Sequence, residues 1–190
     1  MTDETHSGAK LGPIEHQPFY CEENIHRLAS RTDLVVHPSE VLVITNPLRQ
    51  VACWHQRAAE PDEPLLWDYH VVLLEHHPDG PRIWDLDTRL PCPLPAELWV
   101  GATFFDPSQV RRPFHPRFRV VPSRVYLAEL ATDRSHMRTA SGRYRRPPPP
   151  WDPPGAPNMN LETRWLDLTT HPEEVMDRNT LLAHIAALGR

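Results

Sequence analysis

The sequence has only three cysteines, Cys21, Cys53 and Cys92, which lie far apart and form no C-x-x-C pair. An odd number of widely spaced cysteines does not build a disulfide framework and is typical of free thiols in a reducing compartment. Glycine is also scarce, with 7 residues against 23 prolines. We therefore expect rigid, irregular connections between the elements, because proline restricts the backbone that glycine would leave free.

Long apolar runs are absent: none approaches the roughly 18 residues of a membrane span. The first residues are polar and lack the apolar stretch of a secretory signal. Lys10 is the only lysine, the formal net charge is −5, and no basic stripe is interleaved with aromatic residues. These absences argue against membrane and nucleic-acid partners, and we expect a cytoplasmic monomer.

The length of 190 residues allows one domain with a substantial core. Residues 1–18 are polar and aperiodic, and we interpret them as a loosely ordered lead-in to a single catalytic domain over residues 19–190. Residues 133–160 also lack periodicity and contain four consecutive prolines, Pro147–Pro150. A stretch of this length without periodicity in a compact domain is usually functional or disordered. For the proline run we expect a rigid loop packed on its own protein, with a polyproline II ligand for another domain as the alternative.

Local patterns predict both helices and strands. Helical spacing of apolar residues predicts helices over residues 21–31, 122–132 and 180–188. Strands are expected at residues 41–45 and 51–54, joined in a hairpin, at residues 65–74 and 82–87, joined in a second hairpin, and at residues 118–121. A helix followed by hairpins and then by helices predicts an α+β fold.

Cys21 is the cysteine best placed for chemistry, because it stands at the start of the first predicted helix. Unpaired N–H groups and the helix dipole favour a thiolate there. Glu22 and Glu23 oppose this effect, because nearby negative charges raise the pKa of a thiol, so a histidine partner is needed. From its position alone, Cys21 fits the more common role of a small buried apolar residue.

The second predicted hairpin supplies a histidine and two aspartates. Strand alternation places Asp68 and His70 on one face of the first strand, and Asp85 and Asp87 on one face of the returning strand. A carboxylate across from His70 would hold its imidazole in one tautomer. The turn does not fix the register, so both Asp85 and Asp87 stay open. Cysteine, histidine and aspartate are a possible nucleophile, base and orienting acid, although each residue also has an ordinary structural role.

Six sequence blocks occur in a fixed order along the chain. They are Phe19-Tyr20-Cys21-Glu22-Glu23-Asn24, Trp67-Asp68-Tyr69-His70-Val71-Val72-Leu73-Leu74, Asp85-Leu86-Asp87-Thr88, Asp133-Arg134-Ser135-His136-Met137, Pro147–Pro150 and Met159-Asn160-Leu161. In this combination, over about residues 19–161, the chain resembles the protein N-terminal glutamine amidohydrolase family.

The resemblance implies a catalytic triad with Cys21 as nucleophile, His70 as base and Asp85, rather than Asp87, as acid. It implies an α–β–α sandwich similar to the papain/transglutaminase-like cysteine catalytic core, without a metal or organic cofactor. The implied reaction converts the N-terminal glutamine of peptides or proteins to glutamate and ammonia through a thioester. In eukaryotic members this product feeds an N-degron pathway.

Such a substrate carries an α-ammonium group, which requires acidic or polar partners. The candidates in the matching blocks are Glu22, Asp68, Asp133 and Ser135. The chain has 12 histidines, but none lies in an H-x-x-x-H motif with zinc spacing, so we expect no metal site.

Two other classes of interpretation remain open. A transglutaminase-like acyl transferase or a cysteine protease would use the same trio, and release of ammonia without an added amine distinguishes hydrolysis from crosslinking. A non-catalytic module that binds N-terminal residues would not require the three residues together.

Overall fold

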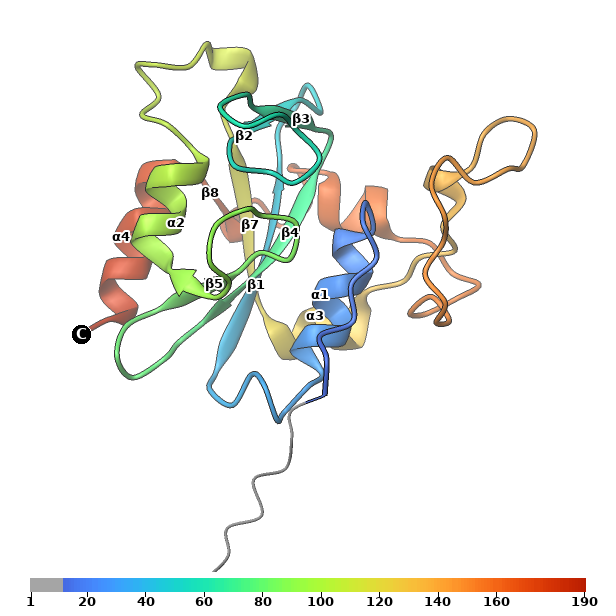
Figure 1. Ribbon diagram of the computed structural model, residues 1–190, viewed down its shortest axis with the longest axis horizontal. Coiled ribbons are helices and arrows are strands. Elements are labelled where there is room, and N and C mark those ends of the chain that lie inside the picture. Colours follow the sequence, from blue (N-terminus) through green and yellow to red (C-terminus); the bar gives the residue numbers. More distant parts are fainter. Residues whose placement is uncertain (1–11) are drawn as a thin grey trace, which may run out of the picture.

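A six-stranded antiparallel sheet forms the centre of the computed structural model, which describes residues 12–190 (Figure 1). In spatial order its strands are β6 (Leu94–Pro95), β5 (Arg82–Trp84), β4 (His70–Glu75), β1 (Ser39–Thr45), β7 (Arg117–Pro122) and β8 (Val175–Met176). All residues of β4 and the last five of β1 are buried. This burial on both faces explains why these segments are continuous apolar runs rather than alternating ones.

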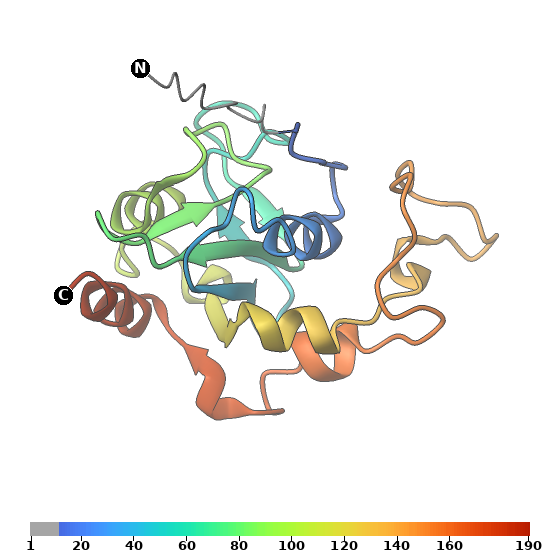
Figure 2. The ribbon, with the colours of Figure 1, turned by 90° about the horizontal axis from the view of Figure 1, so that it is seen from below.

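Helices cover both faces of the sheet (Figures 1 and 2). The helices α1 (Cys21–Ala29) and α3 (Ser123–Glu129) lie on one face, and α2 (Ala96–Thr103) and α4 (Arg178–Leu188) lie on the other. Alternate residues of β4 divide accordingly: Val71 and Leu73 pack in the core on the α1 side, while Val72 and Leu74 pack in the core on the α2 side. The expected single domain of mixed helices and antiparallel strands is confirmed.

Short helical turns occur in the connections. They are the 3₁₀ turns η1 (Arg112–Phe114), η2 (Ser135–Met137) and η4 (Pro172–Glu174) and the π-helical segment η3 (Leu161–Leu166). The three predicted α-helices are all present. Ser123 is the first residue of α3 rather than its N-cap, whereas Asp177 caps α4 by accepting a hydrogen bond from the Thr180 amide at 2.8 Å.

The first predicted hairpin is wrong. β2 (Val51–Cys53) does not pair with β1 but with β3 (Leu65–Trp67), in a separate two-stranded sheet. Both edges of β1 are occupied by β4 and β7. The buried Asn46 directs the chain away from the main sheet, because its amide donates to the carbonyls of Pro113 and His115 at 2.9 and 3.2 Å.

The second predicted hairpin is confirmed with shorter strands. The expected strand 65–74 is interrupted at Asp68 and Tyr69, and residues 65–67 belong to β3. β5 pairs with β4 only as far as Leu73 opposite Trp84, so Asp85 and Asp87 lie beyond the strand. β5 therefore leaves the start of β4 uncovered at this edge.

Residues 12–18 form no helix or strand, but they are attached to the domain. The Asn24 side chain in α1 exchanges hydrogen bonds of 2.8 and 2.9 Å with the backbone of Gln17. The loose order expected for the rest of the lead-in concerns residues 1–11, which lie outside the described residues. No helix in the described part of the chain is long and apolar enough to cross a membrane.

Candidate active site

Cys21 is the first residue of α1 and is buried against β4, with 3% of its surface exposed. The thiol lies close to the backbone of Val71, in the part of β4 that β5 does not pair with. Burial raises the pKa of the Cys21 thiol well above 9.0, and the charge of Glu22 raises it further, while the nearby Val71 backbone lowers it. The helix start alone therefore does not produce a thiolate.

His70, the neighbour of Val71 in β4, is paired with Asp85. The two side chains are buried, and His70 Nε2 lies 2.9 Å from Asp85 Oδ1. His70 Nδ1 is also buried and has no hydrogen-bond partner within residues 12–190. Burial alone would lower the pKa of His70, but the charge and hydrogen bond of Asp85 outweigh it and raise that pKa. The pKa of Asp85 is lowered, because the same pairing and further donors outweigh the effect of burial.

Two side chains that the sequence blocks did not single out hold the Asp85 carboxylate. Gln56 Nε2 and Trp99 Nε1 each donate to Oδ2 at 3.2 Å. On the imidazole side, Trp67 stacks on His70, with ring centroids 5.3 Å apart and planes inclined by 8°. These contacts fix both the plane and the tautomer of the imidazole.

Asp87, the alternative acid, has a different partner. Its Oδ1 lies 2.9 Å from His16 Nε2, and its backbone N–H donates to Asp85 Oδ1 at 3.0 Å. Asp85, and not Asp87, therefore contacts His70.

Glu22 is a second buried carboxylate beside Cys21. Its Oε2 accepts a hydrogen bond from the Tyr69 hydroxyl at 3.0 Å and lies 3.9 Å from the Cys21 sulfur. Its Oε1 is buried and has no hydrogen-bond donor within 3.5 Å among residues 12–190, and His136 Nε2 lies 3.6 Å from it. Burial would lower the pKa of His136, but its interaction with the Glu22 carboxylate raises it.

A cavity of about 230 Å³ opens onto Cys21. Its lining consists of Phe19, Cys21, Trp67, Asp68, Tyr69, His136, Met137, Arg145, Arg146 and Glu162. A second cavity of about 510 Å³ shares Phe19, Trp67 and Arg146 with it, so the two adjoin. Phe19 adopts a left-handed backbone with φ 70°, a strained conformation for a bulky residue.

A family model described as N-terminal glutamine amidase matches residues 16–185. The chain belongs to this family. Curated relatives named protein N-terminal glutamine amidohydrolase include proteins of Homo sapiens (38% identical over 149 residues, 75% of this chain and 73% of the relative) and Danio rerio (37% over 150 residues, 75% and 74%). The Arabidopsis thaliana protein of the same name is 33% identical over 150 residues, covering 74% of this chain and 68% of the relative. The expected family is confirmed, and with it the expectation that the chain is a hydrolase.

The candidate ammonium-binding residues of this amidase family member divide into two groups. Glu22 is buried beside Cys21, and Asp68 lines the same cavity. Asp133 instead accepts a hydrogen bond from the Ser135 amide at 2.8 Å, at the start of η2, and neither residue lines the cavity. The histidine of that sequence block, His136, does line it, although the analysis of the sequence did not assign it a role.

The neighbouring Glu23 anchors the loop over residues 133–157. Its carboxylate accepts two hydrogen bonds of 2.7 Å from Arg134 and one of 2.8 Å from Trp151 Nε1. Arg134 also donates to the Trp151 carbonyl at 2.7 Å. The base of the loop is therefore packed on α1 of its own domain.

Proposed function

We propose that this chain hydrolyses the side-chain amide of an N-terminal glutamine in peptides and proteins, giving N-terminal glutamate and ammonia. In this proposal Cys21 is the nucleophile, His70 the general base and acid, and Asp85 the orienting acid. The observation that carries it is the buried His70, whose Nε2 is held by Asp85 while Nδ1 has no hydrogen-bond partner among residues 12–190, and whose neighbour Val71 lies close to the Cys21 thiol. The names of the curated relatives support the same substrate and reaction.

The steps follow from this arrangement. His70 Nδ1 takes the thiol proton, and the sulfur of Cys21 attacks the side-chain amide carbon of glutamine. The imidazolium then gives its proton to the departing nitrogen, ammonia leaves, and a glutamyl thioester remains. Water, deprotonated by His70, attacks the thioester and releases glutamate and the thiol. The backbone N–H of Cys21, at the start of α1, is our candidate donor to the oxyanion.

Glu22 is our candidate partner for the substrate's α-ammonium, with Asp68 at the cavity wall as a second one. A buried carboxylate oxygen without a hydrogen-bond donor among residues 12–190 favours a cationic ligand, because an incompletely paired buried charge is costly. The same binding would assist the chemistry. Glu22 disfavours the thiolate of Cys21, and an ammonium group bound to Glu22 would offset that charge. A substrate without a free amine would leave Glu22 with only Tyr69 and His136 as described partners, and the thiol would stay protonated.

The fold supports the expected similarity to the papain/transglutaminase-like catalytic core. A cysteine at the N-terminus of a helix packs against an antiparallel sheet whose strand β4 supplies the histidine, and the aspartate follows the neighbouring strand β5. This is the chain order of nucleophile, base and acid that the resemblance implies.

The test compares four peptides of otherwise equal sequence by ammonia release and by mass spectrometry. They begin with free glutamine, acetylated glutamine, free asparagine, or another residue followed by an internal glutamine. We expect turnover of the first peptide alone. An asparagine anchored by its ammonium group holds its amide carbon about 1.5 Å short of Cys21, and a misplacement of about 1 Å can cost on the order of 100-fold. Comparable rates on acetylated or internal glutamine would overturn the N-terminal specificity. Transfer to an added amine without hydrolysis would favour the acyl-transferase alternative.

A further inference from the structure

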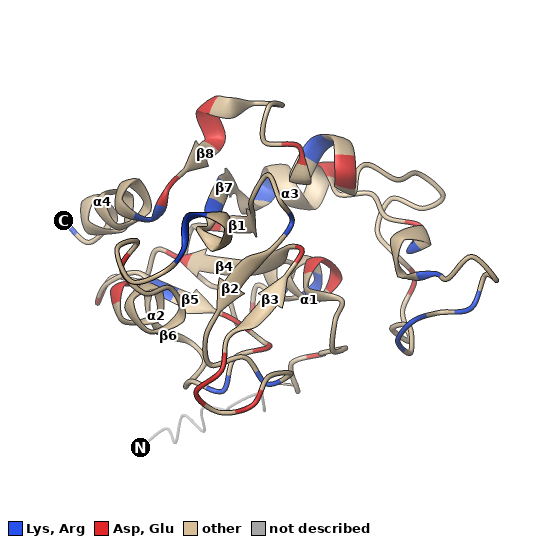
Figure 3. Ribbon diagram, turned by 90° about the horizontal axis from the view of Figure 1, so that it is seen from above, with Lys and Arg blue, Asp and Glu red and all other residues tan. Residues whose placement is uncertain are grey.

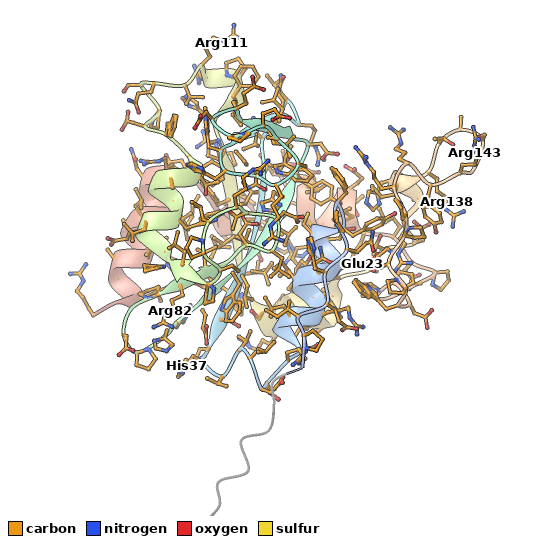
Figure 4. The ribbon with its side chains drawn as sticks, viewed as in Figure 1. Glu23, His37, Arg82, Arg111, Arg138 and Arg143 are labelled. Atoms are coloured by element: carbon orange, nitrogen blue, oxygen red, sulfur yellow. The ribbon has the colours of Figure 1, made fainter. Side chains whose placement is uncertain are left out.

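The loop over residues 133–157 ends in a strongly basic tip that the proposed chemistry does not use. Residues 138–146, here called the basic arm, contain four arginines and no acidic residue, although the whole chain has a net charge of −5. The four are exposed, and they are Arg138, Arg143, Arg145 and Arg146. Figure 3 shows these basic stretches on the loop that projects from the domain, and Figure 4 places Arg138 and Arg143 near its tip.

The basic arm is folded before any ligand binds. Arg138 and Tyr144 form an isolated β-bridge, and the Arg138 guanidinium donates to the Tyr144 hydroxyl at 2.7 Å. The amide of Thr139 donates to the Arg143 carbonyl at 2.8 Å, and Gly142 makes the turn with φ 78°. The pairing of Glu23 with Arg134 fixes the base of the loop. Binding to the basic arm therefore requires little further ordering of its backbone.

None of the four arginines forms an ion pair with a carboxylate among residues 12–190, so their charges are available. Two of them, Arg145 and Arg146, line the cavity that contains Cys21. Arg146 lies over the Phe19 ring at 4.1 Å and also lines the adjoining cavity, together with Arg57. Asp87 is the one carboxylate among the described residues that line the adjoining cavity, and it is already paired with His16. The cavity that contains Cys21 is also lined by Asp68 and by Glu162, which is paired with Arg49, and the basic arm adds the two arginines to this wall.

We infer that the basic arm binds acidic residues that follow the N-terminal glutamine of a substrate. This inference rests on the proposed function, because the chain that continues from a glutamine at Cys21 must leave the cavity that Arg145 and Arg146 line, next to the rest of the basic arm. A nucleic acid fits the basic arm less well. Its single aromatic residue, Tyr144, is covered by the guanidinium of Arg138 at 4.4 Å and is not free to stack on bases.

The expected effect is moderate because these arginines are exposed. A single exposed ion pair changes affinity by about two- to five-fold. We expect three acidic residues to raise kcat/KM roughly ten-fold at low salt, chiefly by lowering KM, because the contacts lie away from the reacting atoms. The preference should fall toward one in about 1 M salt, where the Debye length is about 3 Å.

The experiment uses the full chain and three peptides that begin with glutamine and alanine and continue with three glutamates, three serines or three lysines. We expect kcat/KM to decrease in that order at low salt. Arg143→Gln and the double variant R138Q/R143Q should reduce the ratio of acidic to neutral peptide toward one. The matched control is Arg111→Gln, which removes the same charge from an exposed arginine far from the basic arm (Figure 4).

The outcomes separate this inference from the proposed function. Turnover of all three peptides with equal kcat/KM would overturn the inference alone. A preference that Arg111→Gln reduces as much as Arg143→Gln would overturn the role of the basic arm, because the effect would then come from net charge. Equal kcat/KM combined with tight binding of a short oligonucleotide, lost in R138Q/R143Q, would assign the arm to nucleic acid instead. No turnover of any glutamine peptide would overturn the proposed function and this inference with it.

Discussion

Replacing Glu22 by glutamine should have opposite effects on two reactions of Cys21. The Glu22 carboxylate lies 3.9 Å from the Cys21 sulfur, and its charge disfavours the thiolate. Two charges about 4 Å apart interact with about 4 kcal/mol at an effective dielectric constant of 20. The hydrogen bond from Tyr69 and the nearby His136 reduce this energy in part. We therefore expect alkylation of free Cys21 by iodoacetamide at neutral pH to be at least about ten-fold faster in the variant.

Hydrolysis of an N-terminal glutamine peptide should become slower in the same variant. Glutamine keeps an oxygen that accepts the hydrogen bond from Tyr69, so the site stays packed, but it provides no charge for the substrate's ammonium group. A substrate held about 1 Å away from its productive position loses on the order of 100-fold in rate. We expect kcat/KM to fall by about that factor. The peptide should also lose much of its advantage over its acetylated form, because both now lack a charged partner.

The assay measures the alkylation rate of the substrate-free protein across pH, with Cys53→Ala and Cys92→Ala in the background, and ammonia release in parallel. The matched control is Glu162→Gln, which removes a carboxylate from the wall of the same cavity, where Glu162 pairs with Arg49 rather than with Cys21. Unchanged or slower alkylation in Glu22→Gln would refute the electrostatic role of Glu22. Unchanged kcat/KM would refute its role in binding the ammonium group.

Five further predictions concern the triad, the stability of the domain and the independence of the reaction from a metal. Cys21→Ser should reduce turnover by several orders of magnitude, because a hydroxyl stays protonated at neutral pH, and full activity in a peptide assay would end the proposal. Cys53→Ala should lower the unfolding free energy by about 1–2 kcal/mol at a buried site and leave kcat unchanged, as measured by urea denaturation and kinetics. Asp85→Asn should reduce kcat by about 10³–10⁴-fold through loss of the imidazole orientation, with KM little changed. Because the pKa of Asp85 is lowered from 3.8, its pairing stabilises the folded state at pH values above 3.8. This stabilisation is lost as the pH falls through the folded-state pKa of Asp85. Because the pKa of His70 is raised from 6.5, its pairing stabilises the folded state at pH values below 6.5, and this stabilisation is lost as the pH rises through the folded-state pKa of His70. Asp85→Asn should therefore reduce the pH dependence of the unfolding free energy at both the acidic and the near-neutral end. Addition of a chelator should leave the rate unchanged, and loss of activity restored by zinc would contradict this.

The sequence predicted the layers of the fold better than the strand pairing. Periodicity located α1, α3 and α4, and it identified the hairpin of β4 and β5, because these elements bury a repeating face or lie next to each other in the chain. Local patterns gave the wrong pairing partner for β2. The edge of β1 that β2 was expected to occupy is taken by β7, a strand far along the sequence, and the buried Asn46 is hydrogen-bonded to the chain that precedes β7. Such long-range contacts leave no local signal.

The same distinction applies to the candidate site. Strand alternation could not decide whether Asp85 or Asp87 contacts His70. That depends on where β5 ends and on the hydrogen bonds that Gln56 and Trp99 donate to Asp85. Gln56 lies in an irregular segment, so no pattern marks it. His136 belongs to the same block as Asp133, but no spacing in the sequence distinguishes it as a residue of the cavity. Contacts in the folded chain distinguish the residues of the candidate site from the others. Glu22 lies 3.6 Å from His136, whereas Asp133 accepts a hydrogen bond from the Ser135 amide in a turn.

Glu22 and Glu23 show how two adjacent, identical side chains acquire different roles. Successive residues of a helix point about 100° apart, so one carboxylate faces the cysteine and the sheet while the other faces the loop over residues 133–157. Glu23 is neutralised by Arg134, which makes it a structural anchor whose charge is always compensated. Among residues 12–190 the Glu22 carboxylate has the Tyr69 hydroxyl and His136 beside it, and its Oε1 has no hydrogen bond. Keeping a buried charge incompletely paired costs stability, and on the proposed function the substrate's ammonium group removes that cost when it binds. The same binding event lowers the barrier to forming the Cys21 thiolate, so recognition of the free N-terminus and activation of the nucleophile would be one electrostatic step.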